Sequence, residues 1–408
     1  MIAADSAVSH AAAPRAPVLW LHSHFLLPMG GTKFIYEVVR RLAQRRPVEV
    51  MVEASSDLYR ERYAEAGVPL HEIGTPTSTS MAYWLGFPGF LARDARAVQR
   101  AADGKSALVS SFFPMNWVGT RVARRAGLRH VHLAFEPFPF FHDREVIGLY
   151  PPPKRALLAY LRAAYGRLDA GGVRGADALL TLNDATAGSL EHVYGVRSAT
   201  PTLAGVDTEF FHPYPGDQLA DLRARHGSGP IAIHSTDYSP IKRTDLALRA
   251  FAAADVPDAK LLITSTREDA AVLADLERQA ESLGIRDRVE FLGFLAFEDL
   301  PRYYSLADVM LQTATAAHSG ATTMALPVKE ALACGTPAVR HASTREDVED
   351  GVSGYLVDAE DTRTTGERTA RLLRDRDLSE RFGEAGRARV VELYRWDRVV
   401  DIVEAAIG

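Results

Sequence analysis

Two adjacent glycines, Gly30 and Gly31, form the first segment whose residue types could bind an anionic ligand. They follow an apolar run at 18–21 and precede a helical pattern. Paired glycines let backbone N–H groups approach a phosphate without an intervening side chain, and the start of a helix adds partial positive charge. The alternative is an ordinary tight turn. The spacing G-x-G-x-x-G, typical of dinucleotide-binding enzymes, is not present here, which disfavours a dehydrogenase.

A carboxylate, Glu330, lies near the start of a short helix that Pro327, Gly335 and Pro337 predict. Proline suits a first helical turn, and glycine followed by proline suits a helix end. A carboxylate can accept hydrogen bonds from both hydroxyls of a vicinal diol such as ribose. It could equally do no more than complement the positive end of the helix dipole, and the spacing leaves both interpretations open.

Two adjacent cations, Lys242 and Arg243, follow the apolar run at 231–234. Cations in a loop from strand to helix can neutralise a diphosphate leaving group and so stabilise a transition state. Taken by itself, however, the pair is better explained as the solvated basic start of a helix.

Short apolar runs alternate with longer amphipathic stretches along the chain, and this pattern predicts the elements that position these residues. The run at 18–21 precedes Phe34, Val38 and Leu42, which share one face of a helix. Such β/α alternation predicts an α/β fold with two doubly wound parallel sheets. Further runs lie at 48–52, 107–110, 131–135 and 178–182 and, after a break at 211–217, at 231–234, 260–264, 289–292, 309–312 and 337–340.

The proline- and glycine-containing break at 211–217 predicts two Rossmann-like domains that face each other across a deep cleft. We expect an N-terminal domain at 1–215, in which 1–16 is a disordered Ala-rich leader, and a C-terminal domain at 216–390. The last helical run, 391–408, is expected to pack back on the N-terminal domain. Parallel sheets bind ligands at the carboxyl ends of their strands, and clefts between domains commonly hold substrates.

Composition excludes several classes of protein. The formal net charge of −5 argues against general nucleic-acid binding. The single cysteine, Cys334, excludes an internal disulfide framework and a multi-cysteine zinc site, and it fits the reducing cytoplasm, where we expect the protein. No apolar run reaches about 18 residues, so no transmembrane segment is expected.

In their order and spacing, these motifs resemble glycosyltransferase family 4, a large group of retaining enzymes with the GT-B fold of two Rossmann-like domains. The resemblance spans nearly the whole chain. Each motif alone is weak evidence for the family, but their combination in this order is specific to it. The motifs are Gly30-Gly31, 194–196, 205–211, Lys242, 289–293, 326–328, Glu330-Ala331, 333–337, Glu346, Asp350-Gly351, Gly354 and Trp396.

The resemblance implies a donor site for a nucleoside diphosphate sugar of the UDP, GDP or dTDP type. On this resemblance, Glu330 holds the donor ribose, Lys242 contacts the donor phosphates and the Gly31 backbone lies near the diphosphate. No bound metal or other cofactor is expected, because cationic side chains and helix ends stabilise the leaving group and the departing phosphate can take the acceptor proton. The other expected donor-binding residues are Gly30, Thr322, Thr323, Met324, Ala325 and Leu326, and the expected catalytic residues are Lys242, Arg243 and Glu136.

Two positions on the donor side depart from the family pattern. Thr322 stands eight positions before Glu330, where the family usually has an acidic residue that contacts a hydroxyl of the donor sugar. A hydrogen bond to a charged group is worth about 1.5–3 kcal/mol and a neutral one about 0.5–1.5 kcal/mol, so we expect an atypical donor, such as a deoxy or amino sugar, or a compensating backbone contact. Asp237 stands where many relatives have an arginine, for which Arg243 or Arg267 could substitute.

The acceptor site is expected in the N-terminal domain. Phe135 replaces a histidine that precedes Glu-Pro in a loop of the family, so Glu136 is the remaining polar candidate. Phe138 and His142 complete the expected acceptor-binding residues, with His132 as an alternative to His142. Aromatic residues are dense in this domain and could form walls against a sugar or aglycone, although most are expected to be core: Tyr83, Trp84, Phe87, Phe90, Phe112, Phe113, Trp117, Phe138, Phe140 and Phe141.

The sequence therefore predicts a metal-independent retaining glycosyltransferase that acts on a small-molecule, saccharide or lipid-linked acceptor. The basic segment 93–100 leaves a membrane-bound acceptor open. One alternative is a GT-B sugar-nucleotide epimerase, for which no convincing carboxylate–histidine pair is evident. Another is a non-catalytic sugar-nucleotide-binding partner, which the departures at Thr322, Asp237 and Phe135 favour. The high Ala and Arg content is typical of a GC-rich bacterial source, in which such enzymes modify metabolites or surface polysaccharides.

Overall fold

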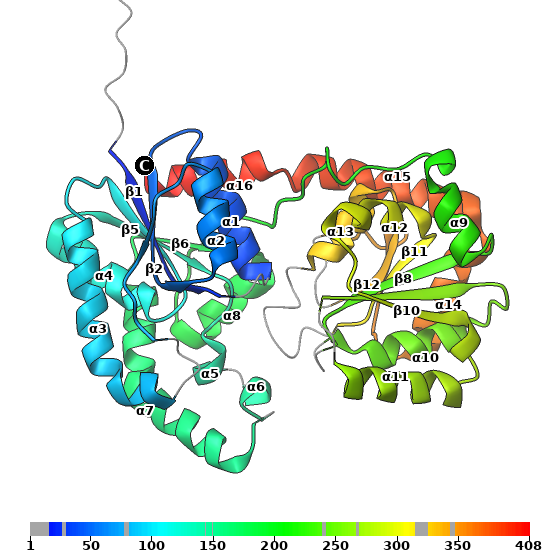
Figure 1. The fold of residues 1–408 in the computed structure, drawn as a ribbon, viewed down its shortest axis with the longest axis horizontal. Coiled ribbons are helices and arrows are strands. Elements are labelled where there is room, and N and C mark those ends of the chain that lie inside the picture. Colours follow the sequence, from blue (N-terminus) through cyan, green and yellow to red (C-terminus); the bar gives the residue numbers. More distant parts are fainter. Residues whose placement is uncertain are drawn as a thin grey trace, which may run out of the picture.

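The computed structural model describes residues 16–26, 30–76, 81–142, 144–148, 150–238, 242–266, 269–314, 325–342 and 347–408. These residues form two α/β domains, each built on one parallel sheet, and the C-terminal helices run along both domains (Figure 1). The structure confirms the predicted fold class of two Rossmann-like domains.

The N-terminal domain contains a seven-stranded parallel sheet in the order β3-β2-β1-β4-β5-β6-β7. The order reverses between β1 and β4, where Val18 pairs with Ala107 and Leu21 with Ser110. Ligands bind at such switch points, outside the carboxyl ends of the strands. The strands are β1 (Val18–Phe25), β2 (Val48–Ser55), β3 (Leu70–Glu72), β4 (Ala107–Ser111), β5 (Arg129–Ala134), β6 (Ala178–Thr181) and β7 (Ala199–Pro201).

Helices cover both faces of this sheet, which explains why its central strands read as continuous apolar runs. Val18 and Trp20 of β1 pack on one face and Leu19 and Leu21 on the other, and all four side chains are fully buried. The helices are α1 (Gly30–Leu42), α2 (Asp57–Glu65), α3 (Met81–Ala101), α4 (Met115–Ala126), α5 (Pro139–His142), α6 (Arg144–Gly148), α7 (Pro152–Arg174) and α8 (Asp184–Tyr194).

The second domain contains a six-stranded parallel sheet in the order β10-β9-β8-β11-β12-β13, with its switch point between β8 and β11. Its strands are β8 (Ile231–Thr236), β9 (Lys260–Ser265), β10 (Val289–Gly293), β11 (Val309–Gln312), β12 (Ala338–His341) and β13 (Gly354–Val357). Its helices are α9 (Ala220–His226), α10 (Thr244–Ala254), α11 (Ala270–Ser282), α12 (Leu300–Leu306), α13 (Leu326–Ala333), α14 (Thr362–Arg374) and α15 (Arg376–Leu393), with 3-10 turns η1 (Gly216–Leu219), η3 (Arg286–Arg288) and η4 (Phe297–Asp299).

The last helix, α16 (Trp396–Ile407), packs on the N-terminal domain, as predicted. The Trp396 ring lies 5.5 Å from that of Phe34 in α1, and Arg129 Nε donates a hydrogen bond to the Ala406 carbonyl at 2.6 Å. The chain crosses between the domains a second time beside this helix, because the Val206 N–H donates to the Tyr394 carbonyl at 2.7 Å. Two crossings therefore connect the domains at adjacent points.

The first sheet ends at Pro201 and the second begins at Ile231, while the boundaries proposed at 215 and 390 stay predictions. Residues 1–15, most of the predicted leader, lie outside the described residues. None of the helices that the structure describes is long and apolar enough to cross a membrane.

Candidate active site

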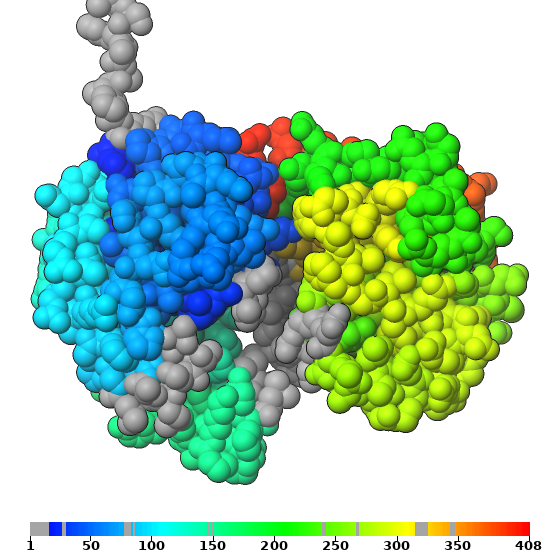
Figure 2. Space-filling model, in the orientation of Figure 1, coloured from blue at the N-terminus to red at the C-terminus, as the bar shows by residue number. Residues whose placement is uncertain are grey.

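The predicted donor-binding residues lie at the switch points of the two sheets. Gly30 and Gly31 begin α1 after β1, and Lys242 and Arg243 precede α10 after β8. Glu330 lies in α13, after β11. Figure 2 shows that the surface is hollowed where the two domains meet. The sequence pattern therefore predicts correctly which strand ends contribute these residues.

Glu330 is a buried carboxylate with partners from both domains. Its side chain is 8% exposed, and its Oε1 lies 3.6 Å from Nζ of Lys33 in α1. Burial raises the pKa of Glu330 above its ordinary value, whereas Lys33 and a hydrogen bond with Tyr304 act to lower the pKa. The fold thus holds a desolvated carboxylate between a cation of one domain and a phenol of the other.

Lys33 is a site residue that the sequence analysis missed. Its ammonium pairs with Glu330 and lies 4.1 Å from the centre of the Phe297 ring in η4. A lysine in the first turn of a helix is unfavourable next to the positive end of the helix dipole, and α1 has no acidic residue in that turn. The position of Lys33 in the first helical turn, two residues after Gly31, is the sequence feature that could have identified it as a site residue.

Tyr304 links Glu330 to the end of β8. Its fully buried side chain lies close enough to interact with Ser235 and with Glu330. Burial raises the pKa of Tyr304 well above its ordinary value, so the phenol keeps its proton and remains available as a donor. Glu330 and the strand that precedes Lys242 therefore belong to one connected region of the second domain.

Lys242 and Arg243 have different surroundings despite their adjacency. Arg243 donates from Nε to Asp245 at 3.1 Å and from Nη1 to Glu360 at 3.2 Å. Its own carbonyl accepts a hydrogen bond from Thr313, which follows β11. Among the described residues, the Lys242 ammonium has no carboxylate partner. The positive charge of Lys242 is thus available to an anion, whereas that of Arg243 is balanced within the protein.

A buried histidine, His234, lies near Lys242. His234 Nδ1 lies 2.8 Å from the Leu311 carbonyl, and its Nε2 lies 3.2 Å from Thr244 Oγ1. Burial, with a smaller contribution from Lys242, lowers the pKa of His234 to about 4. The imidazole is therefore neutral near neutral pH and adds no charge to this part of the site.

Phe135 packs directly against the glycine turn of the N-terminal domain. A Cβ atom added to Gly31 would lie 3.8 Å from the Phe135 ring. That ring also contacts Phe34 and Phe112, each with ring centres 5.6 Å apart. Phe135, expected on the acceptor side, is only 6% exposed and supports the turn that carries the backbone N–H groups of Gly30 and Gly31.

The other predicted acceptor residues meet around Asp169 of α7. His142 Nε2 lies 3.2 Å from Asp169 Oδ2, and the same oxygen accepts a hydrogen bond from the Tyr194 hydroxyl at 2.6 Å. The Phe138 N–H donates to that hydroxyl oxygen at 3.0 Å, and the negative charge of Glu136 helps to raise the pKa of Tyr194. The structure brings Glu136, Phe138 and His142 together, and Asp169 is the hub that the sequence did not identify.

The alternative histidine, His132, is a core residue. It is 3% exposed, and its Nδ1 lies 3.0 Å from Ser110 Oγ. Burial lowers the pKa of His132 to about 4. Most of the dense aromatic residues also lie in the core: all of those predicted, except Phe112, belong to the cluster between the sheet and helices α3, α4 and α7.

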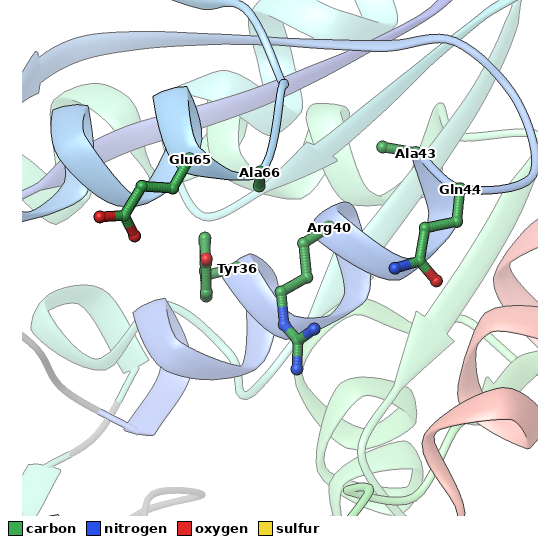
Figure 3. Close-up of a pocket in the computed structure, with 6 residues that line it drawn as sticks. All are labelled: Tyr36, Arg40, Ala43, Gln44, Glu65 and Ala66. Atoms are coloured by element: carbon green, nitrogen blue, oxygen red, sulfur yellow. The ribbon is translucent and has the colours of Figure 1, made fainter.

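Described residues of the N-terminal domain line two surface pockets. The smaller, about 290 Å³, is lined by Tyr36 and Arg40 of α1 and by Glu65 of α2 and contains no predicted site residue (Figure 3). The larger, about 1000 Å³, lies between α6 and α7 and includes His142. Only the second adjoins the predicted acceptor residues.

Several predicted residues lie outside the part of the chain that the structure describes: Thr322, Thr323, Met324, Arg267 and Glu346. Their contacts stay predictions. Ala325 and Leu326, the next residues of the predicted donor segment, are described: Leu326 is the first residue of α13, and Ala325, with a φ of 31°, is its N-cap. No three His, Cys, Asp or Glu side chains among the described residues lie together as a metal site requires.

Comparison with known proteins identifies the family. The family described as glycosyl transferases group 1 matches residues 222–389. A D-inositol 3-phosphate glycosyltransferase of Salinispora tropica is 30% identical over 405 residues, which cover 91% of this chain and 79% of that protein. This chain belongs to the group 1 glycosyltransferases. The result confirms the family predicted from the motifs and identifies the chain as a glycosyltransferase enzyme.

Two further proteins are similar to this glycosyltransferase. A GDP-mannose-dependent alpha-(1-6)-phosphatidylinositol monomannoside mannosyltransferase of Mycolicibacterium smegmatis is 29% identical over 284 residues, 67% of this chain and 69% of that protein. The crystal structure of Anabaena HepE in complex with UDP has a TM-score of 0.76 at 18% identity and covers 96% of this chain and 99% of that chain. The structural likeness confirms the GT-B fold.

Proposed function

We propose that this glycosyltransferase moves a sugar from a nucleoside diphosphate sugar to an acceptor hydroxyl, with retention of anomeric configuration and without a bound metal or other cofactor. The observation that carries the proposal is the meeting of the α1 start, Lys33 and Glu330 at the carboxyl ends of both sheets. A helix start and nearby cations attract a diphosphate, and a buried carboxylate attracts a diol.

Glu330 is the proposed ribose ligand. Desolvation raises its pKa, and hydrogen bonds from two ribose hydroxyls would compensate the buried carboxylate. On this proposal the ribose takes the place of Lys33 at the carboxylate, which frees the ammonium to contact the diphosphate. The nucleotides named for the similar proteins, GDP-mannose and UDP, support a donor of the UDP, GDP or dTDP type.

Lys242 and the N–H groups at the start of α1 are the proposed stabilisers of the leaving group. As the bond between the anomeric carbon and the phosphate oxygen breaks, negative charge grows on the diphosphate, and fixed positive groups stabilise it most in the transition state. The acceptor oxygen attacks from the same face, and the departing phosphate oxygen takes its proton. The products are a glycoside and a nucleoside diphosphate, and no protein base is required. Arg243 contributes less, because Asp245 and Glu360 balance its charge.

The acceptor is proposed to bind in the N-terminal domain beside Glu136, Phe138 and His142. In this proposal Glu136 orients an acceptor hydroxyl, and the Phe138 ring contacts the apolar face of a sugar-like acceptor. The missing acidic residue at Thr322 supports a donor whose sugar lacks the usual hydroxyl contact, such as a deoxy or amino sugar. A strong preference for glucose in a panel of donors would contradict that part of the proposal.

The proposal predicts that Glu330→Ala weakens nucleotide binding without unfolding the protein. We expect at least a tenfold loss of affinity for the preferred nucleoside diphosphate, about 1.4 kcal/mol, measured by calorimetry after a thermal-shift screen of UDP, GDP and dTDP. Glu367→Ala, an exposed carboxylate on α14, is the control and should bind normally. Unchanged affinity in the Glu330 variant would refute the ribose assignment.

The stereochemistry and the role of metals are tested on the wild-type enzyme. We expect the anomeric configuration of the donor in the product, observed by NMR, and full activity in the presence of EDTA. Inversion of configuration would contradict the mechanism, and nucleotide release without a glycoside product would indicate hydrolysis or epimerisation instead.

A further inference from the structure

Four arginines gather at the pocket between α6 and α7. The pocket has a volume of about 1000 Å³ and is lined by Arg144 of α6, by Arg162, Arg167 and Arg174 of α7, and by His142 at the end of α5. We call it the arginine pocket. In Figure 1, α6 lies on the side of the N-terminal domain nearest the second domain. The pocket thus lies beside the predicted acceptor residues rather than on the far side of the domain.

Acidic side chains of the described residues do not balance the charge in the arginine pocket. None of them lines the pocket, and none pairs with Arg144, Arg162 or Arg167. Arg174 donates Nε to the Tyr194 carbonyl at 2.6 Å, a partner without a formal charge. Like charges close together repel, so a concave site that concentrates them is best explained by an anion that they bind.

The α7 helix leaves room for a ligand between these cations. Ala159, Ala163, Gly166 and Ala170 also line the pocket, and their spacing of three and four residues places them along one side of the helix. Their small side chains form a low floor, and the arginines at neighbouring positions form its sides. Guanidinium groups bind phosphate with two parallel hydrogen bonds. The arrangement suits a phosphate group attached to a compact organic body.

The arginine pocket is connected to the acceptor residues through hydrogen bonds. His142 lines the pocket and contacts Asp169 at 3.2 Å. Asp169 accepts from Tyr194, and the Tyr194 oxygen accepts from the Phe138 N–H. An anion in the pocket would therefore position the rest of its molecule against Phe138 and Glu136.

We propose that the arginine pocket binds a phosphate group of the acceptor and thereby orients the acceptor hydroxyl. This proposal rests on the proposed function, glycosyl transfer to an acceptor hydroxyl, and it specifies that the acceptor carries a phosphate group. The phosphate belongs either to a small phosphorylated molecule or to a phospholipid headgroup, and the same guanidinium contacts serve both.

Binding of two probes to the nucleotide-free protein tests this site. The soluble probe is glycerol 3-phosphate, with glycerol as its uncharged control. The membrane probe is vesicles of phosphatidylcholine with phosphatidylglycerol, with pure phosphatidylcholine vesicles as their control. We expect the wild-type protein to bind one phosphate probe and neither control, and added salt to weaken that binding. Glycerol 3-phosphate binding assigns a soluble acceptor, and binding to the anionic vesicles alone assigns a headgroup.

Two kinds of variant locate the binding. Arg162→Gln with Arg167→Gln removes two charges of the pocket, and we expect at least tenfold weaker binding of the probe. Arg363→Gln with Arg376→Gln removes two exposed charges from the second domain and should bind as the wild type does. Ala163→Trp fills the floor without changing any charge, at an exposed helix position that tolerates a large side chain, and should also abolish binding.

The outcomes separate this proposal from the proposed function. If neither probe binds the wild-type protein, or if both double variants lose binding equally, the arginine pocket is not a phosphate site. Nucleotide affinity should be unchanged in all these variants, because they lie outside the donor site. Thermal unfolding of each variant identifies any loss that comes from misfolding, and Ala163→Trp provides a second, charge-neutral measurement if the arginine double variant is unstable.

Discussion

Lys33 makes a contact that joins the two domains at the proposed donor site. The sequence analysis identified Glu330 by its place in a short helix but did not identify the cation opposite it, which belongs to the other domain. It assigned the donor phosphates to Lys242 and left open whether Arg243 substitutes for the missing arginine, but it did not separate the two residues by the partners of their charges. The structure distinguishes them, because Asp245 and Glu360 pair with Arg243 and lie far from each other in sequence. Which cation remains available to a ligand is therefore decided by tertiary contacts.

Lys33→Ala is predicted to make nucleotide binding more sensitive to pH. Lys33 lowers the pKa of Glu330 against the effect of burial, so its removal should raise that pKa further and leave more of the carboxyl protonated at pH 6. A protonated carboxyl accepts fewer hydrogen bonds. Loss of the proposed contact with the diphosphate should weaken nucleotide binding at every pH. We expect a further loss of roughly three- to tenfold at pH 6 relative to pH 8, measured by calorimetry.

Lys105→Ala provides the control for this prediction. It removes another lysine–glutamate pair, with Glu49, which lies near the amino end of β2 and away from the donor site. Its nucleotide affinity should follow that of the wild type at each pH. A Lys33 variant with the same pH profile as the control would contradict the role assigned to the Lys33–Glu330 pair.

At the scale of elements, the strands inside the sheets were predicted well, and three strands at the sheet edges were missed. The cores of β1, β2, β4, β8, β9 and β11 were predicted because strands covered on both faces consist of continuous apolar runs. The strands β3, β7 and β13 lie at the edges of the sheets and have three or four residues each, so they lack such a run. The pairing of elements also creates buried polar contacts that no single segment reveals, such as the one between β2 and α3.

The contact between β2 and α3 predicts a pH dependence of stability. Glu53 of β2 is fully buried, accepts a hydrogen bond from Tyr83 at 3.0 Å and lies beside Asp94 of α3. Burial and the neighbouring Asp94 raise the pKa of Glu53 well above its ordinary value. The folded protein therefore holds a proton that the unfolded chain releases, so the free energy of unfolding falls as the pH rises above about 4.3.

Glu53→Gln should reduce this pH dependence. Glutamine has a similar shape and does not ionise, so the variant should lose less stability than the wild type between pH 5 and pH 8. We expect the difference to be at least about 1.4 kcal/mol, the free energy of one pKa unit, measured by urea unfolding at several pH values. Glu65→Gln, at an exposed position of α2, should show the wild-type dependence. Equal slopes in all three proteins would contradict the prediction.

At the scale of the whole molecule, the last two helices connect the domains. α15 packs on the second domain, and α16, which follows it, packs on the first. The close approach of Gly205 to Trp396 is part of this connection, because a Cβ atom at Gly205 would lie 2.4 Å from the Trp396 ring. Such a distance is too short for any side chain. The glycine is required there by tertiary packing.

Gly205→Ala is predicted to destabilise the protein by displacing α16. Overpacking of this kind typically costs about 1–3 kcal/mol, which urea unfolding measures directly. Gly188→Ala, in α8 with no neighbour within 4 Å of its added Cβ, is the matched control and should be neutral or up to about 1 kcal/mol more stable. If both variants unfold at the same urea concentration as the wild type, α16 does not depend on this contact.

The sequence by itself determined the α/β class, the two sheets, the family and the strand ends at which the predicted donor residues lie, because apolar periodicity and glycine or proline positions are local properties of the chain. Only the tertiary structure decided that Lys33 meets Glu330, that Arg243 is neutralised and that four arginines surround one pocket. These facts depend on which side chains the fold brings together, from two domains at Glu330 and from neighbouring helices at the pocket. Whether a charged side chain is balanced or available to a ligand depends on these neighbours, and spacing along the sequence does not reveal them.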